Sequence, residues 1–154
     1  TATTINGERT CRAITPFGAN TQVKVNGSYP LPMQILVSAT LQNLPGVSYL
    51  ATYAAPTAEV LPSLGRNLSG GTRTVNVPLV LPQTQYENRR TQLDLRISKI
   101  VSIARTRVQA NVDIFNTLNA SSVLDVNNTF GPQWRQPSRI LDARMVQLSA
   151  RIDF

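Results

Sequence analysis

The sequence has no histidine and a single cysteine, Cys11. Without histidine the chain offers no imidazole ligand to a metal ion and no base for a Ser-His-Asp arrangement. With one cysteine it forms no intrachain disulfide. We find no constellation of residues typical of catalysis, metal binding or cofactor binding, and we therefore expect a protein that is not an enzyme.

Charged residues are also scarce, at 15% of the chain against roughly 25% in typical soluble domains. Asn, Gln, Ser and Thr, mixed among aliphatic residues, supply the polarity instead. The net charge is +7, from 15 Lys+Arg and 8 Asp+Glu, and a basic balance can indicate nucleic-acid binding. Here the arginines are spread along the chain and do not interleave with aromatic residues, so we expect no nucleic-acid partner.

Long apolar runs are absent as well. Residues 25–58 carry no charge, but Pro30, Pro32, Pro45 and Pro56 interrupt them, which excludes a membrane helix. The opening residues, TATTINGERTCRAI, lack the apolar core of a secretory signal. Either the protein is not exported or its N-terminus is missing from this sequence.

What the sequence has in abundance is period-two alternation, the pattern of a β-strand with two different faces. Residues 21–30 and 34–42 predict a hairpin joined by the turn PLPM. Alternation returns at residues 91–98 and, after a short link around 99–107, at 108–116. The final strand is predicted at 140–154, which gives about five long strands.

The connections between these strands alternate between short and long. The long ones, residues 43–90 and 116–139, are rich in Pro, Gly, Asn and Ser. TRTVNVPLV, inside the first, predicts an edge strand interrupted at Pro78. Tight turns at one end of a meander and long loops at the other are typical of outer-membrane β-barrels.

The fold class expected is therefore all-β, an antiparallel meander that forms part of a transmembrane β-barrel with short periplasmic turns and long outer loops. One face of the strands is aliphatic and suits lipid. The other face suits a wet lumen, and the residues expected to face the lumen are Lys24, Asp94, Arg96, Asn111, Asp113 and Arg151. The same pattern also fits a soluble β-sandwich with one solvated face.

The chain end favours the barrel. Leu148, Ala150, Ile152 and Phe154 alternate with polar residues, and this pattern resembles the C-terminal signal strand of bacterial outer-membrane proteins. The resemblance implies that the barrel-assembly machinery recognises these four residues. It also implies that this strand closes against the first strand of a barrel.

Longer segments resemble the last strands of TonB-dependent receptors, in particular those with a carboxypeptidase-regulatory-like N-terminal domain. The segments are RRTQLDLRISKI, RVQANVDIFNTLNASSVL, NNTFGPQW and RMVQLSARIDF. Asp113, Asn116 and Asn119 match a D-x-x-N-x-x-N run common near the C-termini of such receptors. PSLGRNLSGG and VPLVLPQTQYENR fit the outer-loop region, and residues 1–20 fit the preceding outer loop.

This resemblance implies a bacterial outer-membrane location and a non-catalytic role in substrate uptake. The implied partners are outer-membrane lipid, the barrel-assembly machinery and the remainder of the receptor chain, meaning the plug and upstream strands. Five strands cannot close a barrel, for which eight is about the minimum, so we expect a C-terminal piece of a longer polypeptide. If the chain stands alone, its edges must pair with copies of itself, in oligomers or fibres.

Several side chains leave alternatives open. Asp94 and Asp113 are either paired carboxylates or part of a charge ladder with Arg96 and Arg151, and we favour the ladder. Cys11, in a predicted outer loop, either pairs with a cysteine elsewhere in a longer chain or stays a free thiol.

The loop aromatics either stack on a ligand or serve in packing and an interfacial girdle; they are Tyr49, Tyr53, Tyr86, Phe130 and Trp134. The loop arginines attract an anionic ligand or bridge lipopolysaccharide phosphates; they are Arg66, Arg73, Arg89, Arg90, Arg135 and Arg139.

Overall fold

The computed structural model describes residues 4–5, 8–9 and 14–154, so Cys11 lies outside the described residues. The fold is mostly β, with antiparallel sheets. It divides into two compact units. The loop unit comprises Thr1–Asn20, Gly46–Asn88 and Val123–Arg139, and the sheet unit comprises Thr21–Pro45, Arg89–Ser122 and Ile140–Phe154.

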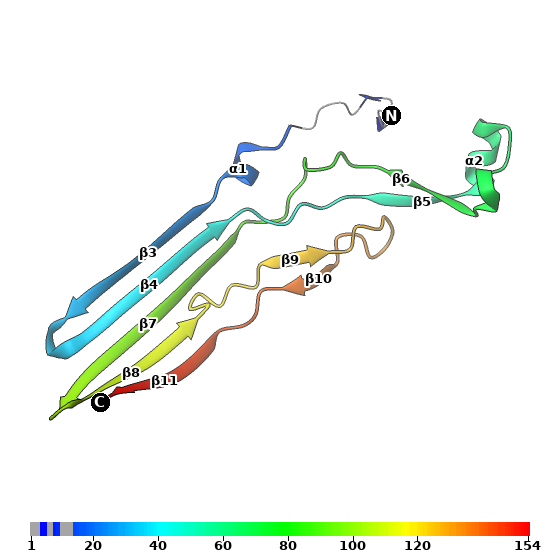
Figure 1. The fold of residues 1–154 in the computed structure, drawn as a ribbon. Coiled ribbons are helices and arrows are strands. Elements are labelled where there is room, and N and C mark those ends of the chain that lie inside the picture. Colours follow the sequence, from blue (N-terminus) through cyan, green and yellow to red (C-terminus); the bar gives the residue numbers. More distant parts are fainter. Residues whose placement is uncertain (1–3, 6–7, 10–13) are drawn as a thin grey trace. The chain divides into compact units, whose positions relative to one another are not determined.

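The sheet unit is one antiparallel sheet with the strand order β11-β8-β7-β4-β3 (Figure 1). Its strands are β3 (Val23–Leu31), β4 (Ile35–Leu44), β7 (Arg90–Ile103), β8 (Thr106–Phe115) and β11 (Met145–Asp153). The predicted hairpin and the two following strands are confirmed. A short 3₁₀ turn, η1 (Pro32–Gln34), joins β3 to β4, with Met33 and Gln34 at positive φ.

The predicted link at residues 99–107 is wrong. The ladder between β7 and β8 continues to the pair Ile103 and Thr106, leaving only Ala104 and Arg105 to turn the chain. Ala104 has a φ of 53°, as a tight hairpin turn requires. The strands run on because Val101 and Ile103 extend the alternation on the same face as Ile97.

The predicted final strand, 140–154, is too long at its start. β11 begins at Met145, and Ile140 belongs to a separate short strand, β10 (Pro137–Ile140), which pairs with β9 (Val123–Val126). The intervening N–H groups of Leu141 and Arg144 bond to Ser122 O and Asn119 Oδ1. Because the preceding loop uses these donors, the ladder with β8 cannot start before Met145.

The loop unit is ordered rather than a plain loop. β5 (Thr52–Pro56) pairs with β6 (Thr74–Pro78), and between them lie α2 (Thr57–Leu64) and the 3₁₀ turn η2 (Ser69–Gly71). A short helix, α1 (Phe17–Asn20), and the strands β1 (Thr4–Ile5) and β2 (Glu8–Arg9) precede the sheet unit in the chain.

The buried apolar residues of the described chain lie in the loop unit; they are Tyr49, Ala51, Ala55 and Val126. β6 ends at Pro78, as predicted for an edge strand, because proline lacks the N–H that would continue the ladder. Among the described helices, none is both long enough and apolar enough to cross a bilayer.

Gly46 sits where two segments of the loop unit run side by side. Glu87 donates its N–H to Val47 O at 2.9 Å, and Tyr49 donates to Gln85 O at 3.1 Å. A Cβ at position 46 would overlap the backbone of Glu87 and Asn88. The glycine is therefore required by the close approach of the two chains.

We expect Gly46→Ala to destabilise the protein by about 2 kcal/mol or more, because the overlapping atoms are backbone and cannot rotate away. Thermal unfolding followed by circular dichroism measures the loss. Gly27→Ala is the matched control, since a Cβ there meets nothing within 4 Å. Equal midpoints for the two variants would contradict the assignment.

Candidate functional site

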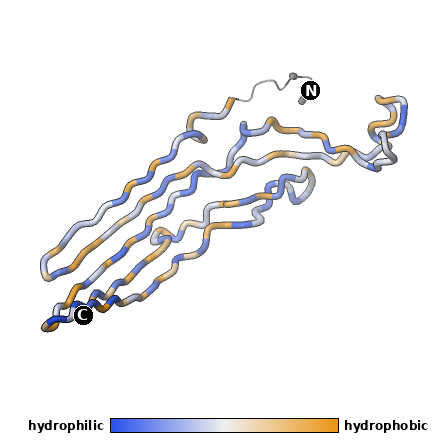
Figure 2. Tube along the Cα trace, in the orientation of Figure 1, coloured by the Kyte–Doolittle hydropathy of each residue, from blue (hydrophilic) through white to orange (hydrophobic). Residues whose placement is uncertain are grey.

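The candidate site is the pair of chemically distinct faces of the five-stranded sheet. One row of register partners, Ser28, Ser38, Arg96, Asp113 and Gln147, is polar on every strand. The next row, Tyr29, Val37, Ile97, Val112 and Leu148, is apolar on every strand. Figure 2 shows this alternation along the strands. The pairing register thus aligns the polar residues of all five strands on one face of the sheet and the apolar residues on the other.

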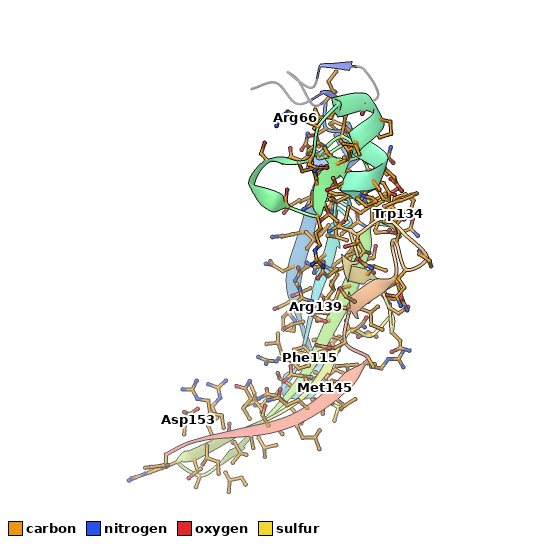
Figure 3. The ribbon with its side chains drawn as sticks, turned by 90° about the vertical axis from the view of Figure 1, so that its right-hand side faces the viewer. Arg66, Phe115, Trp134, Arg139, Met145 and Asp153 are labelled. Carbon is orange, nitrogen blue, oxygen red and sulfur yellow. The ribbon has the colours of Figure 1, made fainter. Side chains whose placement is uncertain are left out.

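The register also places the residues that the sequence singled out. The six polar candidates share the polar face: Lys24, Asp94, Arg96, Asn111, Asp113 and Arg151. Leu148, Ala150 and Ile152 lie on the apolar face of β11, and Phe154 follows its last residue. Figure 3 views the sheet from another side and labels Phe115 and Met145. These two are register partners where β8 ends and β11 begins, and both lie on the polar face.

Two residues at the centre of the polar face are buried, whereas large side chains of the apolar face are exposed. On the polar face, Asp113 is 4% exposed and Ser98 is 1% exposed. On the apolar face, Leu148 is 76% and Ile152 is 60% exposed, and Phe154 is fully exposed. A soluble protein normally buries large aliphatic side chains and solvates the charged ones. Exposed apolar surface of this extent marks a face that contacts something other than water.

The charged residues of the polar face form specific pairs. Arg96 makes a bidentate contact with Asp113, in which Nη2 lies 3.1 Å from Oδ2 and Nε bonds Oδ1. Asp94 instead accepts the backbone N–H of Asn116 at 2.8 Å and the side-chain amide of Gln92 at 3.1 Å. Each carboxylate therefore has its own donors. Of the expected charge ladder, only the contact of Arg96 with Asp113 forms, because Asp94 bonds neutral groups and Arg151 pairs with Asp153.

No metal centre is visible on this face or elsewhere in the part of the chain that the structure describes. There, no group of three or more His, Cys, Asp or Glu side chains lies close enough together to hold an ion. Arg151 pairs with Asp153 two residues along the same strand, at 2.9 Å.

The loop aromatics pack on one another. The rings of Tyr49 and Trp134 are 6.1 Å apart, those of Phe130 and Trp134 are 5.7 Å apart, and those of Tyr53 and Phe130 are 6.3 Å apart. Trp134 donates its Nε1–H to Leu50 O at 2.8 Å. Two of these contacts are edge-to-face and the third is tilted, which is typical of a packed cluster. The packing interpretation therefore explains four of the five aromatics without a ligand.

Polar groups surround this aromatic cluster. The guanidinium of Arg135 lies 4.4 Å from the centroid of Tyr49 and pairs with Glu87 at 3.0 Å. The hydroxyl of Tyr53 donates to Glu59, and this hydrogen bond raises the pKa of Tyr53 above its usual value. Arg89 is likewise engaged, with Asn43 and Thr21 O. Arg66 donates to Ser69 Oγ at 3.2 Å, so at least three of the six loop arginines have partners within the chain.

Sequence reasoning identified the D-x-x-N-x-x-N run but assigned it no structural task. In the structure, Asp113 bonds Arg96, while Asn116 and Asn119 build the turn that follows β8. The two asparagines, three residues apart, could have predicted this turn, because asparagine tolerates positive φ and its side chain bonds nearby backbone groups.

Comparison with known proteins supplies no relative: no protein-family model, curated protein or solved structure matches this chain.

We expect Arg96→Ala to lower the free energy of unfolding by about 1–3 kcal/mol, because it leaves the carboxylate of Asp113 buried without its charged partner. Urea unfolding in detergent micelles, followed by circular dichroism, measures this change. Arg151→Ala is the control: its pair with Asp153 is mostly exposed, and such pairs contribute under about 1 kcal/mol. The interpretation fails if the two alanine variants cost the same.

Proposed function

We propose that the sheet unit is the C-terminal part of the wall of an outer-membrane β-barrel. The whole protein would be a receptor of the TonB-dependent kind that the sequence resembles. This portion is non-catalytic and supplies barrel wall and an assembly signal for substrate uptake. The observation that carries the proposal is the exposed apolar face of five paired antiparallel strands, opposite a polar face on which Arg96 pairs with the buried Asp113.

The physical argument rests on solvation. Each strand has 9 to 14 residues, and about 9–11 tilted residues cross the hydrocarbon core of a bilayer. Lipid accepts an aliphatic surface at no cost, whereas water penalises it by roughly 25 cal/mol per Å². The three inner strands, β4, β7 and β8, pair on both sides, which is the condition that hydrocarbon imposes on backbone groups.

Lys99 is the one charged residue on the apolar face of the three inner strands. It pairs across the sheet with Ile35 and Ala110, near the tight-turn end. Its ammonium group donates to the carbonyl oxygen of Met33 in the η1 turn. A lysine near a strand end can extend its charge to the membrane boundary while its stem lies along apolar surface. Lys99 is thus compatible with a lipid-facing position.

The edge strands β3 and β11 define what the sheet requires from outside. Among the described residues, each pairs on one side only. Within a bilayer the other side must be satisfied, by upstream strands of a longer receptor or by copies of the chain. β11 presents Leu148, Ala150 and Ile152 beside its free edge and leads to Phe154, which is where recognition by the barrel-assembly machinery is proposed.

The second candidate function is a self-associating structural assembly, and the two free edges together with the exposed apolar face favour it. A soluble β-sandwich binding module would need another layer over the apolar face. These three proposals predict different surroundings for the same side chains, so one measurement can separate them.

Neighbouring residues on β8 provide that measurement. Val112 is on the apolar face and Asn111 on the polar face. We expect a nitroxide at Val112→Cys, in a Cys11→Ser background and in lipid vesicles, to collide often with oxygen and rarely with a water-soluble nickel chelate. We expect the reverse at Asn111→Cys, because oxygen concentrates in lipid and the chelate in water. Electron paramagnetic resonance relaxation reports both rates.

Leu148→Cys and Ser149→Cys on β11 repeat the test as a matched pair. If the label at Val112 is shielded from both reagents and the protein stays in solution without lipid, the sandwich is favoured. Shielding from both reagents together with particles that grow with protein concentration favours the self-associating assembly. Either result overturns the barrel proposal.

The proposed assembly signal makes a separate prediction. We expect Phe154→Ala, made in the full-length receptor, to reduce severalfold the heat-modifiable barrel in the outer membrane, while synthesis of the protein is unchanged. The reason is the loss of the terminal aromatic from the alternating face. Asp153→Ala, which alters the opposite face of the same strand, is the control. Unchanged levels of folded Phe154→Ala protein would refute a signal at this residue.

A further inference from the structure

The turn that follows β8 is built around a buried asparagine. Asn116 is 3% exposed and has a φ of 48°. Its Nδ2 donates to Ala120 O at 2.9 Å and to Asp142 O at 2.7 Å, and its Oδ1 accepts the N–H of Ala120 at 2.9 Å. One side chain therefore closes its own turn and also holds the segment that leads into β11.

Asn119 contributes the second half of this arrangement. Its φ is 52°, and its N–H donates to Asn116 O at 2.8 Å. Its Oδ1 accepts the N–H of Arg144 at 3.1 Å, one residue before β11 begins. Nearby, Leu141 donates its N–H to Ser122 O at 2.8 Å. Three hydrogen bonds thus join the turn to residues 141–144.

The turn is itself fixed to the centre of the sheet. Asp94 on β7 accepts the N–H of Asn116 at 2.8 Å, and Leu93 O accepts the N–H of Thr117 at 2.7 Å. The carboxylate of Asp94 is held in turn by Gln92. The chain of contacts runs from β7, through the turn, to the residue before β11.

The register of β11 against β8 must be fixed by contacts other than side-chain alternation. A slip of two residues along β8 would keep Val146, Leu148, Ala150 and Ile152 on the apolar face, so alternation does not forbid it. Residues 116–144 separate the two strands, so no tight hairpin sets the register. In the part of the chain that the structure describes, β8 is the one strand that pairs with β11.

We propose that Asn116 and Asn119 are positioning residues that lock the register of β11 against β8. This register determines the position along the strand direction at which the unpaired edge of β11 and Phe154 are exposed. That consequence for barrel assembly rests on the proposed function, whereas the lock itself does not.

Disulfide cross-linking in the full Cys11→Ser chain, folded in detergent micelles, tests the lock. Asn111 and Ser149 are register partners, so a cysteine pair at these positions should oxidise readily. A pair at Asn111 and Arg151 reports a two-residue slip, because diagonal positions about 7–8 Å apart rarely meet disulfide geometry. The ratio of the two cross-linking yields measures the register.

We expect Asn116→Gly, which loses three part-buried hydrogen bonds, to lower the ratio of in-register to slipped cross-links by about tenfold or more. We expect Asn119→Gly, which loses one exposed hydrogen bond, to lower the same ratio by a smaller factor of about threefold. Glycine accepts the positive φ, so the substitutions remove the side-chain bonds without straining the backbone. Asn127→Gly is the matched control, because Asn127 bonds Thr129 N–H and Gln133 O in the loop unit. This variant should leave the ratio unchanged.

If Asn116→Gly does not fold, Asn119→Gly decides, because it removes only the bond to Arg144. Hydrogen exchange then gives a second reading, in which the amide of Arg144 should lose protection while the β7 amides keep theirs. Unchanged ratios and unchanged exchange overturn the lock. A lost lock with full outer-membrane assembly would instead count against the proposed assembly signal, so the two failures are distinguishable.

Discussion

The structure depends on the register of the five-stranded sheet. Alternation within a strand gives that strand two faces, but only aligned pairing gives the sheet two faces. The row from Tyr29 to Leu148 is apolar on all five strands because β3, β4, β7, β8 and β11 pair with their alternation in phase. A one-residue slip at any ladder would place aliphatic side chains beside polar ones, and a slip between β7 and β8 would also break the bidentate contact of Arg96 with Asp113.

Given that register, the polar face follows from ordinary electrostatics. A single-layer sheet has no apolar core in which to bury its charges, yet Asp113 is nearly inaccessible because Arg96 and neighbouring polar side chains cover it. A covered carboxylate is stable only when donors surround it. Asp94 meets the same condition through backbone and amide donors. The carboxylates of Asp94 and Asp113 are therefore satisfied by donors of the sheet unit, whereas the buried Oγ of Ser98 on the same face has no hydrogen-bond partner.

The sequence predicted what local periodicity controls. It predicted β3, β4, β7 and β8 and which of their residues lie on each face, because period-two alternation can be read directly from the sequence. It missed the turn at Ala104, since Lys99 interrupts the apolar face and resembles the end of a strand. It placed the start of β11 too early, because Leu141–Arg144 also alternate and only their bonds to Asn119 and Ser122 remove them from the ladder. The aromatic cluster joins Leu50 to Trp134, a long-range contact that no local pattern encodes.

Asn116 and Asn119 provide long-range information that the local alternation of side chains lacks. Alternation specifies which face a residue takes but leaves a two-residue slip open, and this ambiguity is greatest for a strand reached through a long connection. Asn116 and Asn119 supply the missing information by bonding backbone groups at fixed positions before β11. The alternation of side chains determines which face of the sheet each residue occupies. The hydrogen bonds from Asn116 and Asn119 to the backbone before β11 determine the position of β11 along β8. An edge strand needs both if a partner strand is to find its unpaired N–H and C=O groups at a defined level.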